Sequence, residues 1–300
     1  MMSLNDQFKV FIMILVFGKN GQVAQALQLD LKGLDAEFFS SDQANFMDTS
    51  AVIKTLESKN PKIVINASAY TLVDKAETDK DAAQQINAIT VGEIAKWCAT
   101  RSVPFIHFST DYVFDGTGSE PMTENHPTRP VNFYGQTKLN GEKLIQQAGG
   151  FYYIFRVSWV YAPWGKNFPK TILRLATERE EISIVNDQFG SPTDAREISA
   201  FVKMIMDPIN NKISIAPGIF HLSFKPYMSW YDLANLTINE ARKNGVELKV
   251  KKVAAICSDK FPTPAKRPIN SRLATQHSVI QSYVDKVKLL AKEKGWGYLS

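Results

Sequence analysis

Ile14-Leu15-Val16-Phe17-Gly18-Lys19-Asn20-Gly21-Gln22-Val23-Ala24 is the stretch from which the fold of this chain follows. Its short, continuous apolar run predicts a buried strand, and the apolar residues after it recur at helical spacing. A glycine-containing turn between a strand and a helix leaves backbone N–H groups free to hold a phosphate. The spacing Gly18-x-x-Gly21-x-x-Ala24 departs from the dinucleotide-binding fingerprint in its first and last positions.

Strand and helix patterns alternate along the first half of the chain. Apolar runs predict strands at 37–40, 62–69, 104–108 and 152–157, and periodic patterns predict helices at 50–59 and 82–99. Such alternation indicates an α/β fold, a Rossmann-type doubly wound parallel sheet. Ligands of these sheets bind beyond the carboxyl ends of the strands. We therefore expect Gly18, Ala67 to Tyr70, and Ser109 to Tyr112 to converge on one edge of the sheet.

The second half of the chain does not continue this alternation cleanly. It predicts helices at 167–178 and 194–206, a strand at 182–185, and a helix that Ser229-x-x-Asp232 caps at its start. We therefore expect a dinucleotide-binding Rossmann domain at 13–160, its sheet continued by later segments. Residues 161–300 are expected to form mainly a smaller, partly discontinuous C-terminal substrate-binding lobe, and residues 1–12 to precede the fold.

Composition narrows the class of protein. Apolar residues make up 44% of the 300 residues and charged residues 22%, as in soluble globular proteins that bury a sizeable core. Cys98 and Cys257 lie far apart, which predicts neither a disulfide framework nor a zinc site. The apolar run 10–17 is too short to span a bilayer, and no small-residue cleavage site follows it. We expect a cytoplasmic protein that does not bind membranes.

The chain carries a net charge of +5, but its basic residues are spread out. No basic stripe carries interleaved aromatic residues, so we expect no nucleic-acid partner. Near the end of the second predicted strand, Asp42 is the only acid, and no Arg or Lys lies beside it to hold a 2′-phosphate. An acid at that place favours NADH. NADPH and NADH both stay open as the cofactor.

A tyrosine and a lysine lie four residues apart in Tyr134-Gly135-Gln136-Thr137-Lys138. On a helix this spacing places both side chains on one face. An ammonium near a phenol lowers the pKa of the phenol, and a tyrosine tuned in this way exchanges protons near neutral pH. On its own the motif is more often a surface tyrosine and a solvated lysine. The predicted convergence of strand ends, with Thr110 at one of them, favours an active site.

Six segments together resemble the extended short-chain dehydrogenase/reductase superfamily and, within it, the family of dTDP-4-dehydrorhamnose reductases. The resemblance runs from about Met13 to Leu273. The segments are Phe17-Gly18-Lys19-Asn20-Gly21-Gln22-Val23, Ala69-Tyr70-Thr71-x-Val73-Asp74-Lys75-Ala76-Glu77, Ser109-Thr110-Asp111-Tyr112-Val113-Phe114, Ser158-Trp159-Val160-Tyr161, Asn186-Asp187-Gln188-Phe189-Gly190-x-Pro192-Thr193 and Pro262-Thr263-Pro264-Ala265-Lys266-Arg267-Pro268-x-Asn270-Ser271.

The resemblance implies NAD(P)H-dependent reduction of the C4 ketone of dTDP-4-dehydro-L-rhamnose to dTDP-L-rhamnose, a step of the nucleotide-sugar metabolism that feeds O-antigen synthesis. Tyr134 would be the proton donor, Thr110 a second donor to the oxygen, and Lys138 would lower the tyrosine pKa. Substrate-binding residues would be Thr71, Val73, Thr110, Asp111 and Trp159. Cofactor-binding residues would be Gly18, Gly21, Gln22, Val23, Asn45, Phe46, Ala67, Ser68, Ala69, Tyr70, Tyr134 and Lys138.

Departures from related families sharpen this expectation. Sugar-nucleotide dehydratases of the superfamily carry Asp-Glu after the threonine, whereas Tyr112 follows Thr110-Asp111 here. The acid–base pair for elimination is missing, which favours a reductase. Some members bind magnesium between subunits through carboxylates. The matching positions here are Ala26 and Arg196, so we predict no metal site.

Two alternatives stay open at this stage. One is a reductase of another nucleotide-linked ketosugar, because the sequence does not read the base or the sugar stereochemistry. The other is a non-catalytic, dinucleotide-binding regulatory subunit resembling that of methionine adenosyltransferase. The intact Thr110, Tyr134 and Lys138 argue against this second alternative. A homodimer is one option for the oligomeric state, on which no segment is informative.

Overall fold

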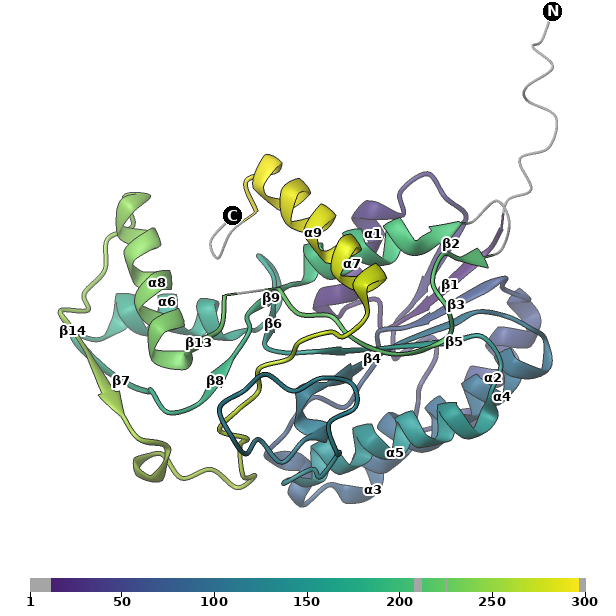
Figure 1. The fold of residues 1–300 in the computed structure, drawn as a ribbon, viewed down its shortest axis with the longest axis horizontal. Coiled ribbons are helices and arrows are strands. Elements are labelled where there is room, and N and C mark those ends of the chain that lie inside the picture. The colour runs from purple at the N-terminus through teal and green to yellow at the C-terminus, as the bar shows by residue number, and fades with distance from the viewer. Residues whose placement is uncertain (1–11, 208–211, 225, 297–300) are drawn as a thin grey trace, which may run out of the picture.

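The computed structural model describes residues 12–207, 212–224 and 226–296. A parallel six-stranded sheet in the order β12-β5-β4-β3-β1-β2 forms its centre (Figure 1). Strand order reverses beside β1, as in doubly wound sheets. The predicted Rossmann-type fold is thus confirmed. The strands are β1 (Ile14–Phe17), β2 (Ala36–Phe39), β3 (Ile63–Asn66), β4 (Phe105–Thr110), β5 (Tyr152–Val157) and β12 (Gly218–His221).

Helices cover both faces of the sheet, because each face presents continuous apolar residues (Figure 1). On one face, α1 (Gln22–Asp30), α7 (Ala195–Ile205) and α9 (Ser278–Glu293) bury Leu27, Phe201 and Val284. On the other face, Leu56, Ile94 and Ile145 are buried. They come from α2 (Thr49–Lys59), α4 (Thr90–Thr100) and α5 (Phe133–Ala148).

A smaller group of elements lies to one side of the sheet, at the left of Figure 1. Here α6 (Phe168–Glu178) and α8 (Trp230–Lys243) pack on the parallel pair β7 (Glu181–Val185) and β14 (Lys252–Ile256) around Ile172, Ile182 and Ile238. The Ser229–Asp232 capping box begins α8, as predicted. Short two-stranded pairs join this group to the sheet: β6 (Val160–Tyr161) with β9 (Thr193–Asp194), and β8 (Phe189–Gly190) with β13 (Met228–Ser229). A further pair is β10 (Met206–Asp207) with β11 (Lys212–Ile213).

Most elements agree with the sequence predictions, and β5 agrees in both bounds. Two elements differ. The strand predicted at 62–69 ends at Asn66, because the chain turns there beside Gly18. The helix predicted at 82–99 is divided into α3 (Lys80–Gln84), a π-helical turn (Gln85–Ile89) and α4. Single-turn 3₁₀ helices occur at Lys75–Glu77, Asp111–Val113 and Ser258–Lys260.

Among the described residues, every helix falls short of the length and apolarity that crossing a membrane requires. Residues 1–11, which contain most of the segment expected to precede the fold, lie outside the described ranges.

Candidate active site

A cavity of about 800 Å³ opens at the carboxyl ends of the central strands. The ends of β1, β3, β4 and β5 supply one side, and the loop after β6 and the start of α8 supply the other. Its lining contains the following predicted site residues: Gly18, Gly21, Gln22, Val23, Ala67, Ser68, Ala69, Thr71, Val73, Thr110, Asp111, Tyr134, Lys138 and Trp159. The predicted convergence of strand ends is therefore present in the structure.

The glycine-rich turn after β1 lies very close to the backbone that follows β3. Gly18 has a φ of 92°, and a Cβ on it would lie 2.6 Å from the carbonyl carbon of Ala67. Gly21 occupies the N-cap of α1 without a side-chain cap, so the first N–H groups of the helix stay open. Open N–H groups at the positive end of a helix dipole suit a pyrophosphate. The residues present therefore fit a bound dinucleotide.

Three predicted cofactor residues lie outside the lining. Phe46 is buried in the core, edge-on to Phe17 at 5.3 Å between ring centroids. Asn45 accepts a hydrogen bond from the N–H of Met47 through its side chain. Tyr70 donates its hydroxyl to Asp79 and is held by Asn87 through its backbone. At the end of β2 the lining instead contains Ser40 and Ser41, not Asp42.

Tyr134 enters the cavity from the first turn of α5. The side chain of Asn132 caps this helix by accepting from the N–H of Gly135 (2.8 Å). Gly135 lies against the backbone of the 3₁₀ turn, since a Cβ there would be 2.1 Å from the carbonyl oxygen of Tyr112. The helix start therefore lies directly against the turn that carries Thr110. The hydroxyl of Thr110 hydrogen-bonds to the phenol of Tyr134.

The protonation state of Tyr134 differs from the sequence prediction. Burial and the nearby Asp111 carboxylate raise the pKa of the phenol, although the Thr110 hydrogen bond opposes them. Lys138 is not among the groups that shift it. The prediction that Lys138 lowers the pKa of Tyr134 is therefore wrong for this structure. A phenol that keeps its proton at neutral pH is the form that a proton donor requires.

Lys138 lies one turn further along α5 and is 2% exposed. Its Nζ donates to the carbonyl oxygen of Phe108 (2.7 Å) and lies 3.2 Å from Nε2 of His107. Burial lowers the pKa of the ammonium to about 8, against the opposing charge of Glu142. Its charged and uncharged forms are thus close in free energy near neutral pH.

Asp111 is buried beside these groups. Its Oδ1 accepts from the hydroxyl of Thr110 (3.1 Å), and Ser271 also hydrogen-bonds to the carboxylate. Its Oδ2 is buried without a hydrogen-bond partner among the described residues. Burial raises the pKa of Asp111 to about 7. Asp111 lines the cavity, so this carboxylate borders the space that a ligand would fill.

The opposite wall is aromatic. Trp159 has a φ of 48°, and its ring stacks on Trp230 with 3.4 Å between ring centroids and an interplanar angle of 9°. Gly190 leaves room for the indole, because a Cβ there would lie 2.3 Å from it. Sequence reasoning missed Trp230. Its position directly after the cap residue Ser229 is a signal of a helix start but not of a ligand wall.

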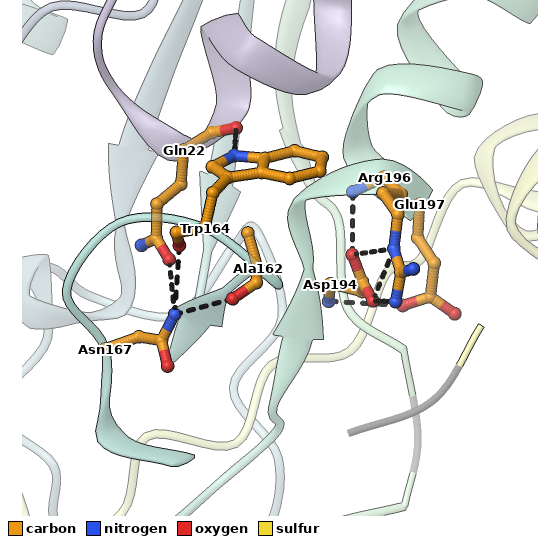
Figure 2. A network of polar contacts seen from close by, with 7 residues as sticks. All are labelled: Gln22, Ala162, Trp164, Asn167, Asp194, Arg196 and Glu197. Carbon is orange, nitrogen blue, oxygen red and sulfur yellow. Dashed lines mark hydrogen bonds and ion pairs between the residues drawn. The ribbon is translucent and has the colours of Figure 1, made fainter. Parts of the chain in front are cut away.

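The loop 162–167 fastens the second group of elements to the glycine-rich turn. Trp164 donates its indole N–H to the carbonyl oxygen of Gln22 (3.0 Å), and Asn167 donates to the side-chain oxygen of Gln22 (2.9 Å). Figure 2 shows both contacts, with Asn167 also donating to the carbonyl oxygen of Ala162 (2.8 Å). Gly165 and Lys166 of this loop line the cavity.

Three basic residues outside the cavity lining have protein partners. Arg267 pairs with Asp74 at 2.8 Å, and Arg272 donates to the carbonyl oxygen of Ser119. Arg196 pairs with Asp194 at 2.5 Å, as Figure 2 also shows. Among the described residues no three His, Cys, Asp or Glu side chains are grouped as metal ligands. The absence of a metal site remains a prediction.

Comparison with known proteins agrees with this geometry. The RmlD substrate binding domain family matches residues 12–287. The dTDP-4-dehydrorhamnose reductase of Escherichia coli K12 is 45% identical, over 88% of this chain and 89% of its own. That of Burkholderia thailandensis is 40% identical, over 88% of this chain and 90% of its own. The solved structure of the Bacillus anthracis dTDP-4-dehydrorhamnose reductase in complex with NADP superposes with a TM-score of 0.82 at 31% identity, covering 94% of this chain and 99% of that one.

Proposed function

From the membership of this chain in the family of dTDP-4-dehydrorhamnose reductases, we propose that it reduces the C4 ketone of dTDP-4-dehydro-L-rhamnose to dTDP-L-rhamnose with NADPH or NADH. One observation carries the proposal: Thr110, Tyr134 and Lys138 line the same cavity as the glycine-rich turn. A nucleotide-sugar ketone and a dinucleotide would thus meet at one edge of the sheet. The same edge is where doubly wound sheets bind their ligands.

The residues on this wall match the demands of ketone reduction. The reduced nicotinamide, when bound, supplies a hydride. As the carbonyl oxygen gains negative charge, it needs a hydrogen-bond donor and then a proton. Tyr134 keeps its proton at neutral pH and would deliver it, since an alkoxide is more basic than a phenolate. Thr110 would donate a second hydrogen bond, and Lys138, one turn further along α5, would supply positive charge to the same wall of the cavity when it is protonated.

The other walls suit the remaining parts of the two ligands. Gly18, Gly21 and the open N–H groups of α1 would hold the pyrophosphate of the dinucleotide. Thr71, Val73 and Asp111 would border the sugar, with the free oxygen of Asp111 accepting from a sugar hydroxyl. The stacked indoles of Trp159 and Trp230 offer a flat apolar surface to the sugar or the base. Each assignment follows from the position of the residue in the cavity lining.

We further propose a division of labour along the chain. Residues 13–160, completed by β12, would bind the dinucleotide, and 161–300 would supply mainly the substrate-binding lobe. The separate apolar cluster of α6, α8, β7 and β14 supports this division. A cytoplasmic location would account for the free cysteines Cys98 and Cys257. A homodimer would account for the exposed apolar side chains Leu29 and Leu289. Size-exclusion chromatography with light scattering would test the dimer.

The decisive experiment measures turnover. Purified protein with dTDP-4-dehydro-L-rhamnose should oxidise NADPH or NADH and form dTDP-L-rhamnose. Tyr134→Phe removes only the phenolic proton and should lower kcat by about 10²–10⁴-fold, the usual contribution of a positioned proton donor. Its affinity for cofactor should stay near that of the wild type. Full activity of this variant would refute the role of Tyr134, and absence of turnover by the wild type would refute the function.

A further inference from the structure

Lys138 ends a buried chain of hydrogen bonds that begins at the cavity wall. The N–H of Ser68 donates to Oδ1 of Asn66 (2.9 Å), and Nδ2 of Asn66 lies 3.1 Å from Nδ1 of His107. On the far side of the imidazole, Nε2 of His107 lies 3.2 Å from Nζ of Lys138. Asn66 is 0% and His107 1% exposed, and the two are register partners on β3 and β4. Neither lines the cavity, so both contact the site through its lining residues, Ser68 at one end and Lys138 at the other.

The direction of this chain is fixed at its Ser68 end. A backbone N–H can only donate, so the Asn66 atom that faces Ser68 is the carbonyl oxygen. The amide nitrogen of Asn66 then faces His107, whose Nδ1 must accept. His107 is neutral, because burial and the charge of Lys138 hold its pKa well below the usual value. The single ring proton of His107 is therefore on Nε2, facing Lys138.

This arrangement distinguishes between the two forms of Lys138. An Nε2–H group and an ammonium both donate, so they oppose each other at 3.2 Å. The uncharged amine has a lone pair that accepts from Nε2–H. The other tautomer of His107 would accept from the ammonium but would turn Nδ1–H against the NH₂ group of Asn66. The hydrogen bonds at Asn66 and at Lys138 can therefore both form when Lys138 is uncharged. When Lys138 is charged, one of the two contacts places two donors against each other.

We propose that Asn66 and His107 are positioning residues that set the protonation state of Lys138 through the tautomer of His107. The inference rests on the proposed function, because Lys138 serves that reaction next to Tyr134. Of the other charged groups nearby, Glu142 is on the same helix and pairs with Arg156 of β5 at 2.7 Å, and Asp111 follows β4. The charge of Glu142 favours the ammonium form of Lys138, whereas the hydrogen bonds from Asn66 through His107 favour its uncharged form.

Nuclear magnetic resonance of the wild-type protein labelled with ¹⁵N-histidine tests the chain without any turnover. His107→Gln identifies the resonances of His107. Above the pKa of Lys138, near 8, we expect the Nε2–H tautomer, and below it a shift towards Nδ1–H. In Lys138→Met the Nε2–H tautomer should persist at every pH. One unchanging tautomer in the wild type from about pH 6 to about pH 10 would overturn the proposal.

Kinetics supply the second test. In Asn66→Asp a carboxylate accepts from Nδ1–H of His107, which leaves Nε2 free to accept from the ammonium. The pH limb of kcat due to Lys138 should then move up by about one unit. Asn140→Asp is the matched control, because it adds the same charge on α5 at a residue that bonds to Gln84 and Gln136 instead. An unmoved limb, or an equal shift in both variants, would contradict the role of Asn66.

Discussion

The hydroxyl of Thr110 has three neighbours whose needs differ. It hydrogen-bonds to the phenol of Tyr134, donates to Asp111, and accepts from the N–H of Tyr112 (3.2 Å). In the proposed reaction its single hydrogen would turn from Asp111 to the developing alkoxide. Thr110→Val keeps the shape but removes the hydroxyl, and should lower kcat by about 10²-fold with little change in KM. Steady-state kinetics check this, with Thr110→Ser as the control that keeps at least a tenth of the activity.

Asp111 should make the stability of the folded protein depend on pH. Its pKa is raised to about 7, so the folded state keeps a proton that the unfolded chain loses above about pH 4. The unfolded state binds fewer protons in this window, and stability therefore falls as pH rises from about 4 to about 7. Asp111→Asn does not titrate. The Tm of this variant minus the Tm of the wild type should therefore be larger by a few degrees at pH 8 than at pH 4.

Thermal unfolding of both proteins across this range measures the effect. The same Tm difference at both ends of the range would show that the Asp111 carboxylate is not desolvated as the structure indicates. Activity serves as a separate readout, because the side-chain amide of Asn at this position keeps one acceptor oxygen. The KM of Asp111→Asn for the sugar nucleotide should rise if a sugar hydroxyl binds the free oxygen of Asp111.

In helix α5, local sequence predicts where the side chains lie but not their pKa values. The spacing of Tyr134 and Lys138 predicted that both lie on one face, and both do line the cavity. Their predicted electrostatic coupling failed, because desolvation and Asp111 determine the pKa of Tyr134. These effects arise from the 3₁₀ turn and from burial by segments far away in sequence. A local motif places side chains on an element, but it does not describe the dielectric that surrounds them.

The seating of α5 depends on Gly135. A Cβ at this position would lie 2.1 Å from the backbone oxygen of Tyr112, which has no rotamer to give way. Gly135→Ala should therefore displace the helix start and lower kcat by at least about 10-fold, since a small misplacement of a reacting group is costly. The control for a tight helix contact away from the cavity is Gly92→Ala in α4, where the Cβ would meet the Cβ of Leu144 at 2.9 Å and no backbone atom of the site. Equal activities of the two variants would contradict this reading.

Strand and helix predictions were most accurate where burial is continuous. The apolar runs of β1 and β5 define their own bounds, because both faces of a central parallel strand are covered. β12 was missed, since its four residues follow a proline and lack a long apolar run. The divided helix around 82–99 was also missed. Its π-helical turn places Asn87 to bond Tyr70 and Thr137, a tertiary requirement that periodicity does not record.

On the scale of the whole molecule, the cavity exists only because distant segments close on the sheet. Arg267 bonds to Asp74 across a sequence separation of 193 residues, and Asn132 donates to the backbone oxygen of Lys266. The stacked indoles of Trp159 and Trp230 join the sheet edge to α8. The aromatic wall could not be predicted from sequence for this reason. Neither Trp159 nor Trp230 is marked out by its local sequence, and only the tertiary fold places the two rings against each other.

The contact between Asn167 and Gln22 should couple the two parts of the site. Asn167 also caps α6 by accepting from the N–H of Lys170 (3.1 Å). Asn167→Ser keeps a capping oxygen but loses the amide that donates to Gln22, so cofactor Kd should rise by about 2–10-fold at nearly unchanged stability. Asn167→Ala should show the same rise together with a loss of about 1 kcal/mol in the free energy of unfolding.

Titration of NADPH by fluorescence and chemical denaturation separate these two effects. If the loop 162–167 carries the coupling, the Kd of both variants for NADPH rises while only Asn167→Ala loses stability. If Asn167 serves the helix alone, Asn167→Ser binds NADPH as the wild type does. The second result would leave Trp164, whose indole N–H donates to the backbone of Gln22, as the residue through which the loop 162–167 acts on the glycine-rich turn. Cofactor binding would then depend on the backbone of the glycine-rich turn and not on its glutamine side chain.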